Sequence, residues 1–196
     1  NGSEVSSLAA LQAIVDATLV RFNALATIAA YADSNGPLTA APALSDFSLA
    51  GVSGVDNSNR LAIASALAST AITGAQVDTT AELQTLVDAY ALILGKANGA
   101  APDATPLVQI SASDYSAIGA SVAAGLSNGS AAQALLNDVV GNSTAAAVDR
   151  VSKIDALATV AQSIANLAAQ SSMPSPAPTL TPADFALLGV SGVTSA

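Results

Sequence analysis

Apolar residues recur at intervals of three and four along much of the chain, which is the spacing of one face of an α-helix. Three stretches follow this pattern. The positions on the helix face are Leu8, Leu11, Val15, Leu19, Phe22, Leu25 and Ala29; Leu83, Leu86, Val87, Tyr90 and Leu94; and Val148, Val151, Ile154 or Asp155, Ala158, Ala161, Ile164 and Leu167. Strict alternation of apolar and polar residues, the pattern of a half-buried strand, is scarce. The sequence therefore predicts an all-α protein.

The second of these helices has a clear start in the sequence. Thr79 or Thr80 is placed near its N-cap, and Glu82 falls in its first turn. A hydroxyl at the N-cap and a carboxylate in the first turn both satisfy backbone N–H groups that the helix leaves unpaired.

A ten-residue phrase recurs along the chain. Residues 46–55 (DFSLAGVSGV) return as residues 184–193 (DFALLGVSGV), and a weaker copy, DYSAIGA, occupies residues 114–120. The copies begin 68 and then 70 residues apart, so the sequence predicts a tandem repeat with a period of about 69 residues. Phe22 and Tyr90 each precede a copy by 24 residues and are interpreted as a second marker of the same register, with Val160 at that place in the third unit.

Each phrase has the signals of a short capped helix. Thr181 is expected at the N-cap, Pro182 at the first helical position and Asp184 at the third, and Ser111 with Asp114 repeats the arrangement. The first copy has Ala43 in place of the hydroxyl, so Ser45 is an alternative cap for a helix with a shifted start. The residues expected to end these helices in the left-handed conformation are Gly51, Gly119 and Gly189.

Loops rich in Pro, Gly and Asn precede the phrases at residues 33–37, 98–103 and 171–178. Each unit should thus hold two longer helices, a loop, a short helix and a Gly turn. The predicted units are residues 1–55, which is partial, residues 56–123, and residues 124–196, which include the start of a further unit. Partial units at both ends indicate either a fragment of a longer array or a subunit that docks head to tail on the next copy.

Composition excludes several classes of function. The chain has 47 alanines among 196 residues and no Cys, His or Trp. Disulfide frameworks, Cys/His zinc sites and Ser-His-Asp catalysis therefore lack their side chains. Five Lys and Arg against fourteen Asp and Glu give a net charge of −9, which disfavours nucleic acid as a partner.

Alanine also accounts for the positive mean hydropathy of +0.54. The most apolar stretch, residues 8–32, is interrupted by Gln12, Asp16, Arg21 and Asn23, so we expect no insertion into a membrane. The N-terminal residues are neither basic nor followed by a clean apolar run, which does not match an intact signal peptide.

The acidic residues offer little catalytic chemistry. Asp46, Asp114 and Asp184 could be repeated calcium ligands, but no second acidic residue lies two or four positions away, and helix capping is the favoured interpretation. Asp149 and Asp155 are six residues apart and so fall on different sides of a helix, and with Arg150 and Lys153 next to them they are interpreted as a solvated, self-neutralising face. Residues 51–54 lack the Lys and the preceding strand of a phosphate loop. We therefore expect no enzyme, no catalytic or metal-binding residue and no cofactor.

Residues 180–193 and 77–90, with Lys96 to Gly99 after them, resemble helical tandem repeats of very large bacterial secreted and cell-surface proteins, similar to adhesins of the type I secretion class. The resemblance implies an extracellular, structural or adhesive protein built from long arrays of modules. The middle unit departs from it, because residues 119–123 (GASVA) replace the GVSGV turn.

Together these observations predict a non-catalytic extracellular or cell-surface bacterial protein that serves as an adhesin stalk, a filament subunit or a biofilm matrix scaffold. Its expected partner is a further copy or a neighbouring repeat module. The alternative is a helical interaction module that binds a peptide or a helical partner in a groove between units. A third class, an enzyme or metal protein, would need tight metal binding around the scattered Asp residues.

Overall fold

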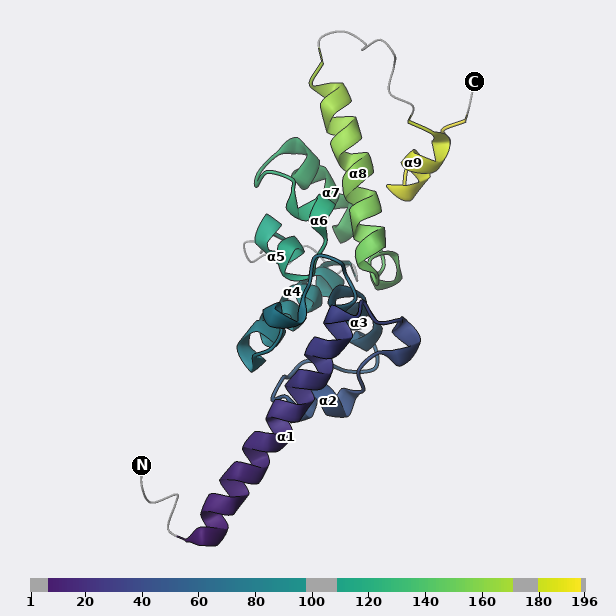
Figure 1. Cartoon of the computed structure of the whole chain (residues 1–196). Coiled ribbons are helices and arrows are strands. Elements are labelled where there is room, and N and C mark those ends of the chain that lie inside the picture. The colour runs from purple at the N-terminus through teal and green to yellow at the C-terminus, as the bar shows by residue number, and fades with distance from the viewer. Residues whose placement is uncertain (1–6, 98–108, 171–179, 195–196) are drawn as a thin grey trace.

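A computed structural model describes residues 7–97, 109–170 and 180–194, and these residues form helices, 3-10 turns and loops without any strand (Figure 1). The prediction of an all-α protein is confirmed for this part of the chain. The α-helices are α1 (Leu8–Asp33), α2 (Leu44–Leu49), α3 (Arg60–Leu67), α4 (Thr80–Ala97), α5 (Ala112–Ala117), α6 (Ser121–Ala124), α7 (Ala131–Gly141), α8 (Val151–Ala168) and α9 (Pro182–Leu187).

The elements follow one another in a recurring order. A long helix (α1, α4 or α8) is followed by a short one (α2, α5 or α9), and α3 and α7 lead through the 3-10 turns η3 (Gly74–Gln76) and η4 (Ala145–Ala147) into the next long helix. Helices α4 and α8 both have 18 residues, and α8 begins 71 residues after α4. The starts of α2, α5 and α9 lie 68 and 70 residues apart. The order of elements is thus regular, while the intervals are not equal.

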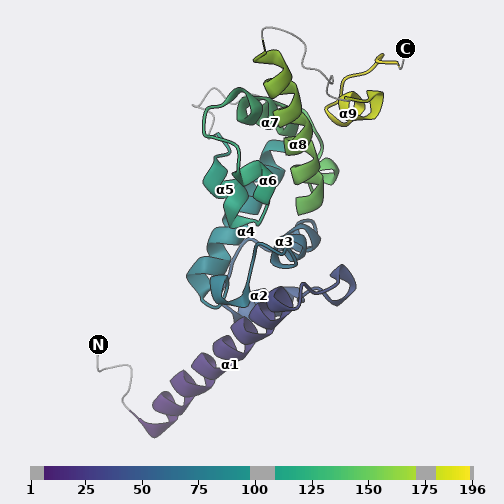
Figure 2. The ribbon, with the colours of Figure 1, turned by 45° about the horizontal axis from the view of Figure 1, so that its top comes forward.

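Helix α4 lies in the middle of an elongated molecule (Figures 1 and 2). It packs against α3, α5, α7 and η4, so both its neighbours in sequence and more distant elements bury its apolar face. Tyr90 is fully buried in this core, and its hydroxyl donates a hydrogen bond to the carbonyl of Val148 at 3.0 Å. This bond satisfies a polar group that would be costly to bury unpaired.

Phe22 and Tyr90, which the sequence predicts as markers of one register, have different surroundings in the structure. Phe22 is 66% exposed, whereas Tyr90 is fully buried. The reason is the length of α1, which has 26 residues against 18 in α4, so equal distances to the following phrase lead to different places along the two helices. Only the C-terminal part of α1, with Ala24, Ile28, Tyr31 and Ala32, enters the core.

The short helices begin as their sequences indicate. The Asp184 carboxylate accepts a hydrogen bond from the Thr181 N–H at 2.7 Å, and the Thr181 hydroxyl accepts one from the Asp184 N–H at 3.3 Å. Ser111 and Asp114 form the same pair at 2.8 and 3.3 Å. The left-handed conformation is confirmed for the three terminating glycines, whose φ angles are 81°, 73° and 81° for Gly51, Gly119 and Gly189.

The first short helix needs no hydroxyl cap. Helix α2 begins directly after Ala43, and the Asp46 carboxylate accepts the hydrogen bond of the Ala43 N–H at 2.7 Å. Ser45 lies inside the helix, so the alternative of a shifted start at Ser45 is wrong. A carboxylate at the third position can satisfy the cap amide without help from the cap side chain.

Two of the three loops rich in Pro and Gly, residues 98–103 and 171–178, lie outside the described residues. The first loop is described, and Asp33 at its start accepts a hydrogen bond from the Gly74 N–H at 2.6 Å, which ties the end of α1 to η3. The boundary predicted after residue 55 falls between α2 and α3. The boundary predicted after residue 123 falls inside α6.

The buried tyrosines make stability sensitive to alkaline pH. Burial raises the pKa of Tyr90 and of Tyr115 well above its usual value. An unfolded phenol ionises near pH 10 while the folded one stays protonated, so the unfolded state releases more protons above that pH. We expect the free energy of unfolding to fall above about pH 10, by roughly 1.4 kcal/mol per pH unit for each buried tyrosine.

Urea unfolding followed by circular dichroism across this pH range measures the effect, and the Tyr90→Phe variant should show a shallower pH slope. Because the chain has three Tyr and no Trp, tyrosinate absorbance reports phenol ionisation directly. Ionisation of all three tyrosines with ordinary pKa values in the folded protein would contradict the burial of Tyr90 and Tyr115.

Candidate docking surface

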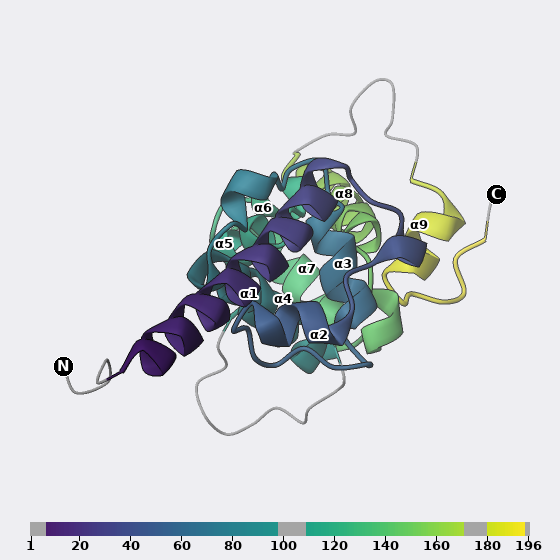
Figure 3. The ribbon, with the colours of Figure 1, turned by 60° about the horizontal axis from the view of Figure 1, so that its bottom comes forward.

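The N-terminal half of α1 is an apolar surface that no other described part of the chain covers. None of residues 8–23 is buried, and Figures 1 to 3 show this half of the helix projecting from the rest of the molecule. Its large exposed apolar side chains are Leu8, Leu11, Ile14, Val15, Leu19, Val20 and Phe22. Leu8, Leu11, Val15, Leu19 and Phe22 belong to the apolar helix face that the sequence predicts, and the structure leaves them exposed to solvent. Exposed apolar patches of this kind mark interaction sites in soluble proteins.

This half of α1 closely matches the start of α4. Residues 8–17 (LAALQAIVDA) and residues 80–89 (TAELQTLVDA) are identical at six of ten positions. In both helices a hydroxyl at the N-cap, from Ser7 and Thr79, accepts a hydrogen bond from the backbone N–H three residues on. Both also carry the same side-chain pair, because Gln12 donates to Asp16 at 2.8 Å and Gln84 donates to Asp88 at 2.8 Å.

The two matching segments differ in what covers them. Leu83, Leu86 and Val87 of α4 are at most 2% exposed, whereas their counterparts Leu11, Ile14 and Val15 are 45%, 44% and 51% exposed. The same residues of α4 match buried residues of α8 at an interval of 71, namely Ile154, Leu157 and Ala158. The face that α4 and α8 bury is therefore presented to solvent by α1.

A turn from the preceding short helix docks on this face in α4. The Gln84 side chain accepts a hydrogen bond from the Ser53 N–H at 2.9 Å and donates one to the Ser53 carbonyl at 3.2 Å. The Thr80 hydroxyl donates to the Ala50 carbonyl at 2.6 Å, and a Cβ at Gly54 would lie 3.8 Å from Val87. We call this contact, between residues 50–55 and the row Thr80, Gln84 and Val87, the Gln84 joint.

Helix α8 holds its preceding segment from the same position. Asp155, 71 residues after Gln84, accepts hydrogen bonds from the N–H groups of Val122 and Ala123 at 2.9 and 3.1 Å. These two N–H groups lie in the first turn of α6, where a carboxylate is favourable. The Gln84 amide in α4 and the Asp155 carboxylate in α8 thus have the same role, because each binds backbone groups of the segment that follows a short helix.

The interpretation of Asp155 as part of a solvated, charge-neutralising group with Arg150 and Lys153 is therefore wrong. Asp149 alone forms the ion pairs, with Lys153 at 2.7 Å and Arg150 at 3.6 Å. Sequence spacing placed both acidic residues near the two cations, but α6 packs on α8 and brings two backbone N–H donors to Asp155. That contact spans more than 30 residues, so no local pattern indicates it.

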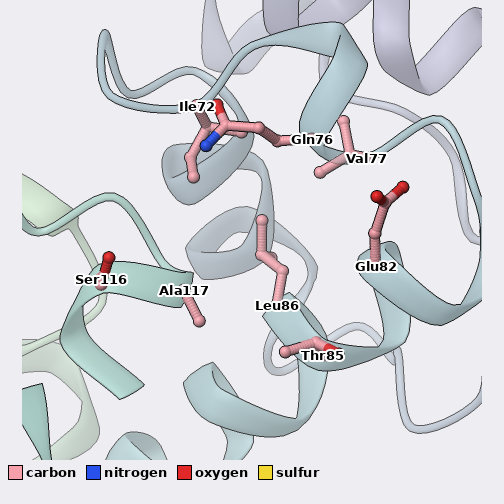
Figure 4. A pocket seen from close by; sticks show the side chains of 8 residues that line it. All are labelled: Ile72, Gln76, Val77, Glu82, Thr85, Leu86, Ser116 and Ala117. Atoms are coloured by element: carbon pink, nitrogen blue, oxygen red, sulfur yellow. The ribbon is translucent and has the colours of Figure 1, made fainter. Parts of the chain in front are cut away.

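A pocket beside α4 offers few groups for catalysis. It encloses about 230 Å³ between η3, α4 and α5 and is lined by Ile72, Gln76, Val77, Glu82, Thr85, Leu86, Ser116 and Ala117 (Figure 4). Glu82 is its one ionisable side chain, and the hydrogen bond from the Thr79 hydroxyl lowers the pKa of this carboxyl. A carboxylate held ionised without a proton-transfer partner in the pocket does not favour general acid–base catalysis.

The three repeated aspartates do not come together. Asp46, Asp114 and Asp184 each sit in the first turn of a separate short helix and bind the cap amide there. Hydrogen bonds from Thr181 lower the pKa of Asp184. Within the described residues no three acidic side chains gather as a possible metal site. This geometry agrees with the capping interpretation of these residues.

Length and composition alone would let α1 cross a membrane, and little of it is buried in the molecule. The helix nevertheless carries Asp16 and Arg21 within its apolar stretch. Core helices of other proteins and signal sequences can have the same length and hydropathy. The length and hydropathy of α1 therefore do not test the prediction that the chain does not insert into a membrane.

Gln84 and Gln12 should respond very differently to truncation. Gln84→Ala removes two hydrogen bonds to the Ser53 backbone, and we expect the free energy of unfolding of the monomer to fall by about 1–2 kcal/mol. Gln12→Ala, at the matching but exposed position, should change it by less than about 0.5 kcal/mol. Chemical denaturation at low protein concentration measures both, and equal losses would contradict the Gln84 joint.

Comparison with known proteins leaves the function to be argued from this geometry. The chain matches no family model, no curated protein and no solved structure. The features that bear on function are therefore the uncovered face of α1 and the joints that cover the matching faces of α4 and α8.

Proposed function

We propose that this chain is a non-catalytic structural protein whose helical units associate head to tail, as an adhesin stalk, a filament subunit or a biofilm matrix scaffold outside the bacterial cell. The observation that carries the proposal is the uncovered N-terminal half of α1. It has the apolar residues of a packed helix face and no cover within the described residues. Heterologous contacts between such a face and a different surface of the next copy extend an array.

The recurring order of elements supports an array of similar units. Both intervals between long helices contain a short helix, a medium helix and a 3-10 turn in the same order. The first also contains η2 (Leu38–Ala40) and the second α6, and α4 and α8 bury matching positions. We propose that these intervals are tandem repeats of about 69 residues, with local length changes in the loops and in α1. In such an array each unit covers the open face of its neighbour.

Charge favours association through the face of α1. The chain carries a net charge of −9, so copies repel each other over most of their surface. Residues 8–23 contain only one acidic and one basic side chain, Asp16 and Arg21, and are locally neutral. The apolar half of α1 is therefore a place where two acidic copies can meet with little electrostatic cost.

The second candidate function is binding of a peptide or helical partner in a groove between units. The pocket between η3, α4 and α5 favours it, because Ile72, Val77 and Leu86 give it an apolar wall. A pocket of about 230 Å³ holds one or two side chains rather than the face of a helix. This candidate would leave the face of α1 unexplained.

Sedimentation velocity tests the proposed function. We expect the average mass of the purified chain to rise steadily from micromolar to millimolar concentration, and negative-stain electron microscopy of concentrated samples to show linear particles. Added salt screens the repulsion between acidic copies and should strengthen the association. A monomer at all concentrations, with and without salt, would contradict self-association.

A further inference from the structure

We propose that the turn at residues 189–193 of one copy docks on the start of α1 in a second copy, and that Gln12 binds the backbone of Ser191 as Gln84 binds that of Ser53. This inference rests on the proposed self-association and names its joint. The occupant of the uncovered α1 face is then a defined segment of another copy of this chain.

The turn at residues 189–193, which we call the donor turn, already has the conformation of residues 51–55. Residues 189–193 and 51–55 have the same sequence, GVSGV. Gly51 and Gly54 have φ angles of 81° and 81°, and Gly189 and Gly192 have φ angles of 81° and 84°. In both turns the first Val closes back on the aromatic residue of its helix, because Val52 donates to the Phe47 carbonyl and Val190 to the Phe185 carbonyl, each at 2.9 Å.

The donor turn lacks the cover that its counterpart has. Val52 is 7% exposed in the Gln84 joint, whereas Val190 is 47% exposed and Val193 is 39% exposed. Phe47 is fully buried, while α9 as a whole contributes no buried residue. The second copy of the turn is thus formed, apolar and uncovered.

The receiving row on α1 repeats the row that holds the first turn. Leu8, Gln12 and Val15 correspond to Thr80, Gln84 and Val87 of the Gln84 joint. Gly54 approaches Val87 to within van der Waals contact of an added Cβ, and Gly192 would approach Val15 in the same way. Leu8 replaces Thr80, so the hydrogen bond from Thr80 to the Ala50 carbonyl has no counterpart, and Leu8 offers apolar contact instead.

Gln12 is held ready for this role. Gln84 uses one hydrogen of its amide nitrogen for Asp88 and the other for the Ser53 carbonyl, while its amide oxygen accepts from the Ser53 N–H. Gln12 already makes the matching bond to Asp16 at 2.8 Å. This bond orients the Gln12 amide and leaves its oxygen and one hydrogen free for the Ser191 backbone.

Within one copy the proposed donor and receiving surfaces do not meet. The N-terminal half of α1 and helix α9 lie at opposite ends of the molecule in Figures 1 and 2. Docking the turn of one copy on α1 of the next therefore produces a head-to-tail contact that can repeat. Such a contact is heterologous and grows into a linear array unless the rotation between copies closes a ring.

Disulfide trapping tests the joint, because the chain has no Cys of its own. A Gln12→Cys variant and a Ser191→Cys variant are mixed and oxidised mildly, and the covalent dimer is measured on a non-reducing gel. The double variant Gln84→Cys/Ser53→Cys calibrates the geometry, because its two cysteines should close a bond within one chain. Ala134→Cys, exposed on α7, replaces Gln12→Cys as the control partner.

We expect the Gln12 and Ser191 pair to give at least about tenfold more dimer than the control pair. In sedimentation velocity, the Val15→Asp variant should self-associate with a dissociation constant about tenfold or more above that of the wild-type chain, because the substitution places a charge in the buried contact. Ala13→Asp, on the opposite side of α1 at the position that exposed Thr85 occupies in α4, should leave association unchanged.

The outcomes separate the joint from the proposed function. Association of the wild-type chain without selective Gln12 and Ser191 trapping would overturn the joint and leave head-to-tail assembly standing on another surface. A wild-type chain that stays monomeric would overturn both. Binding of α1 to vesicles of phosphatidylethanolamine and phosphatidylglycerol, in place of self-association, would assign the face to a membrane and overturn the joint as well.

Discussion

The cover of one helix face is the interaction on which the rest of this structure depends. A long Ala-rich helix has good intrinsic propensity, but helices of about 15 residues are only marginally stable in water unless another element buries their apolar face. Helix α4 has that cover from α3, α5 and α7, and it holds the middle of the molecule together. The start of α1 closely matches that of α4 and has no such cover within the described residues, so the burial that stabilises α4 favours a partner on α1.

In both α4 and α8, one side chain in the second turn of the long helix forms hydrogen bonds with the backbone of the preceding segment. Gln84 and Asp155 occupy this position in α4 and α8 and bind N–H groups of the segment after a short helix. Because the bonds go to the backbone, the turn sequence can change from GVSGV to GASVA while the connection persists. A side chain with an acceptor oxygen at this position thus positions each unit against the next.

Local chemistry made much of the fold predictable from the sequence. The caps at Ser111 and Thr181 and the glycine at 189 depend on residues within a few positions of one another, and they were predicted correctly. Exposure of Phe22 and the partner of Asp155 depend on contacts between distant elements and on the length of α1. The match between residues 8–17 and 80–89 was present in the sequence, but the equal spacing of Phe22 and Tyr90 pointed to a different register.

The most direct measurement of the central claim is amide hydrogen exchange of the purified chain as a function of its concentration. An uncovered helix opens easily, so the amides of residues 8–22 should exchange quickly in the dilute monomer. The account predicts that they become protected as the concentration rises, together with residues 189–193, while the amides of α4 stay protected throughout. Exchange in residues 8–22 that is independent of concentration would contradict the claim that a second copy covers this face.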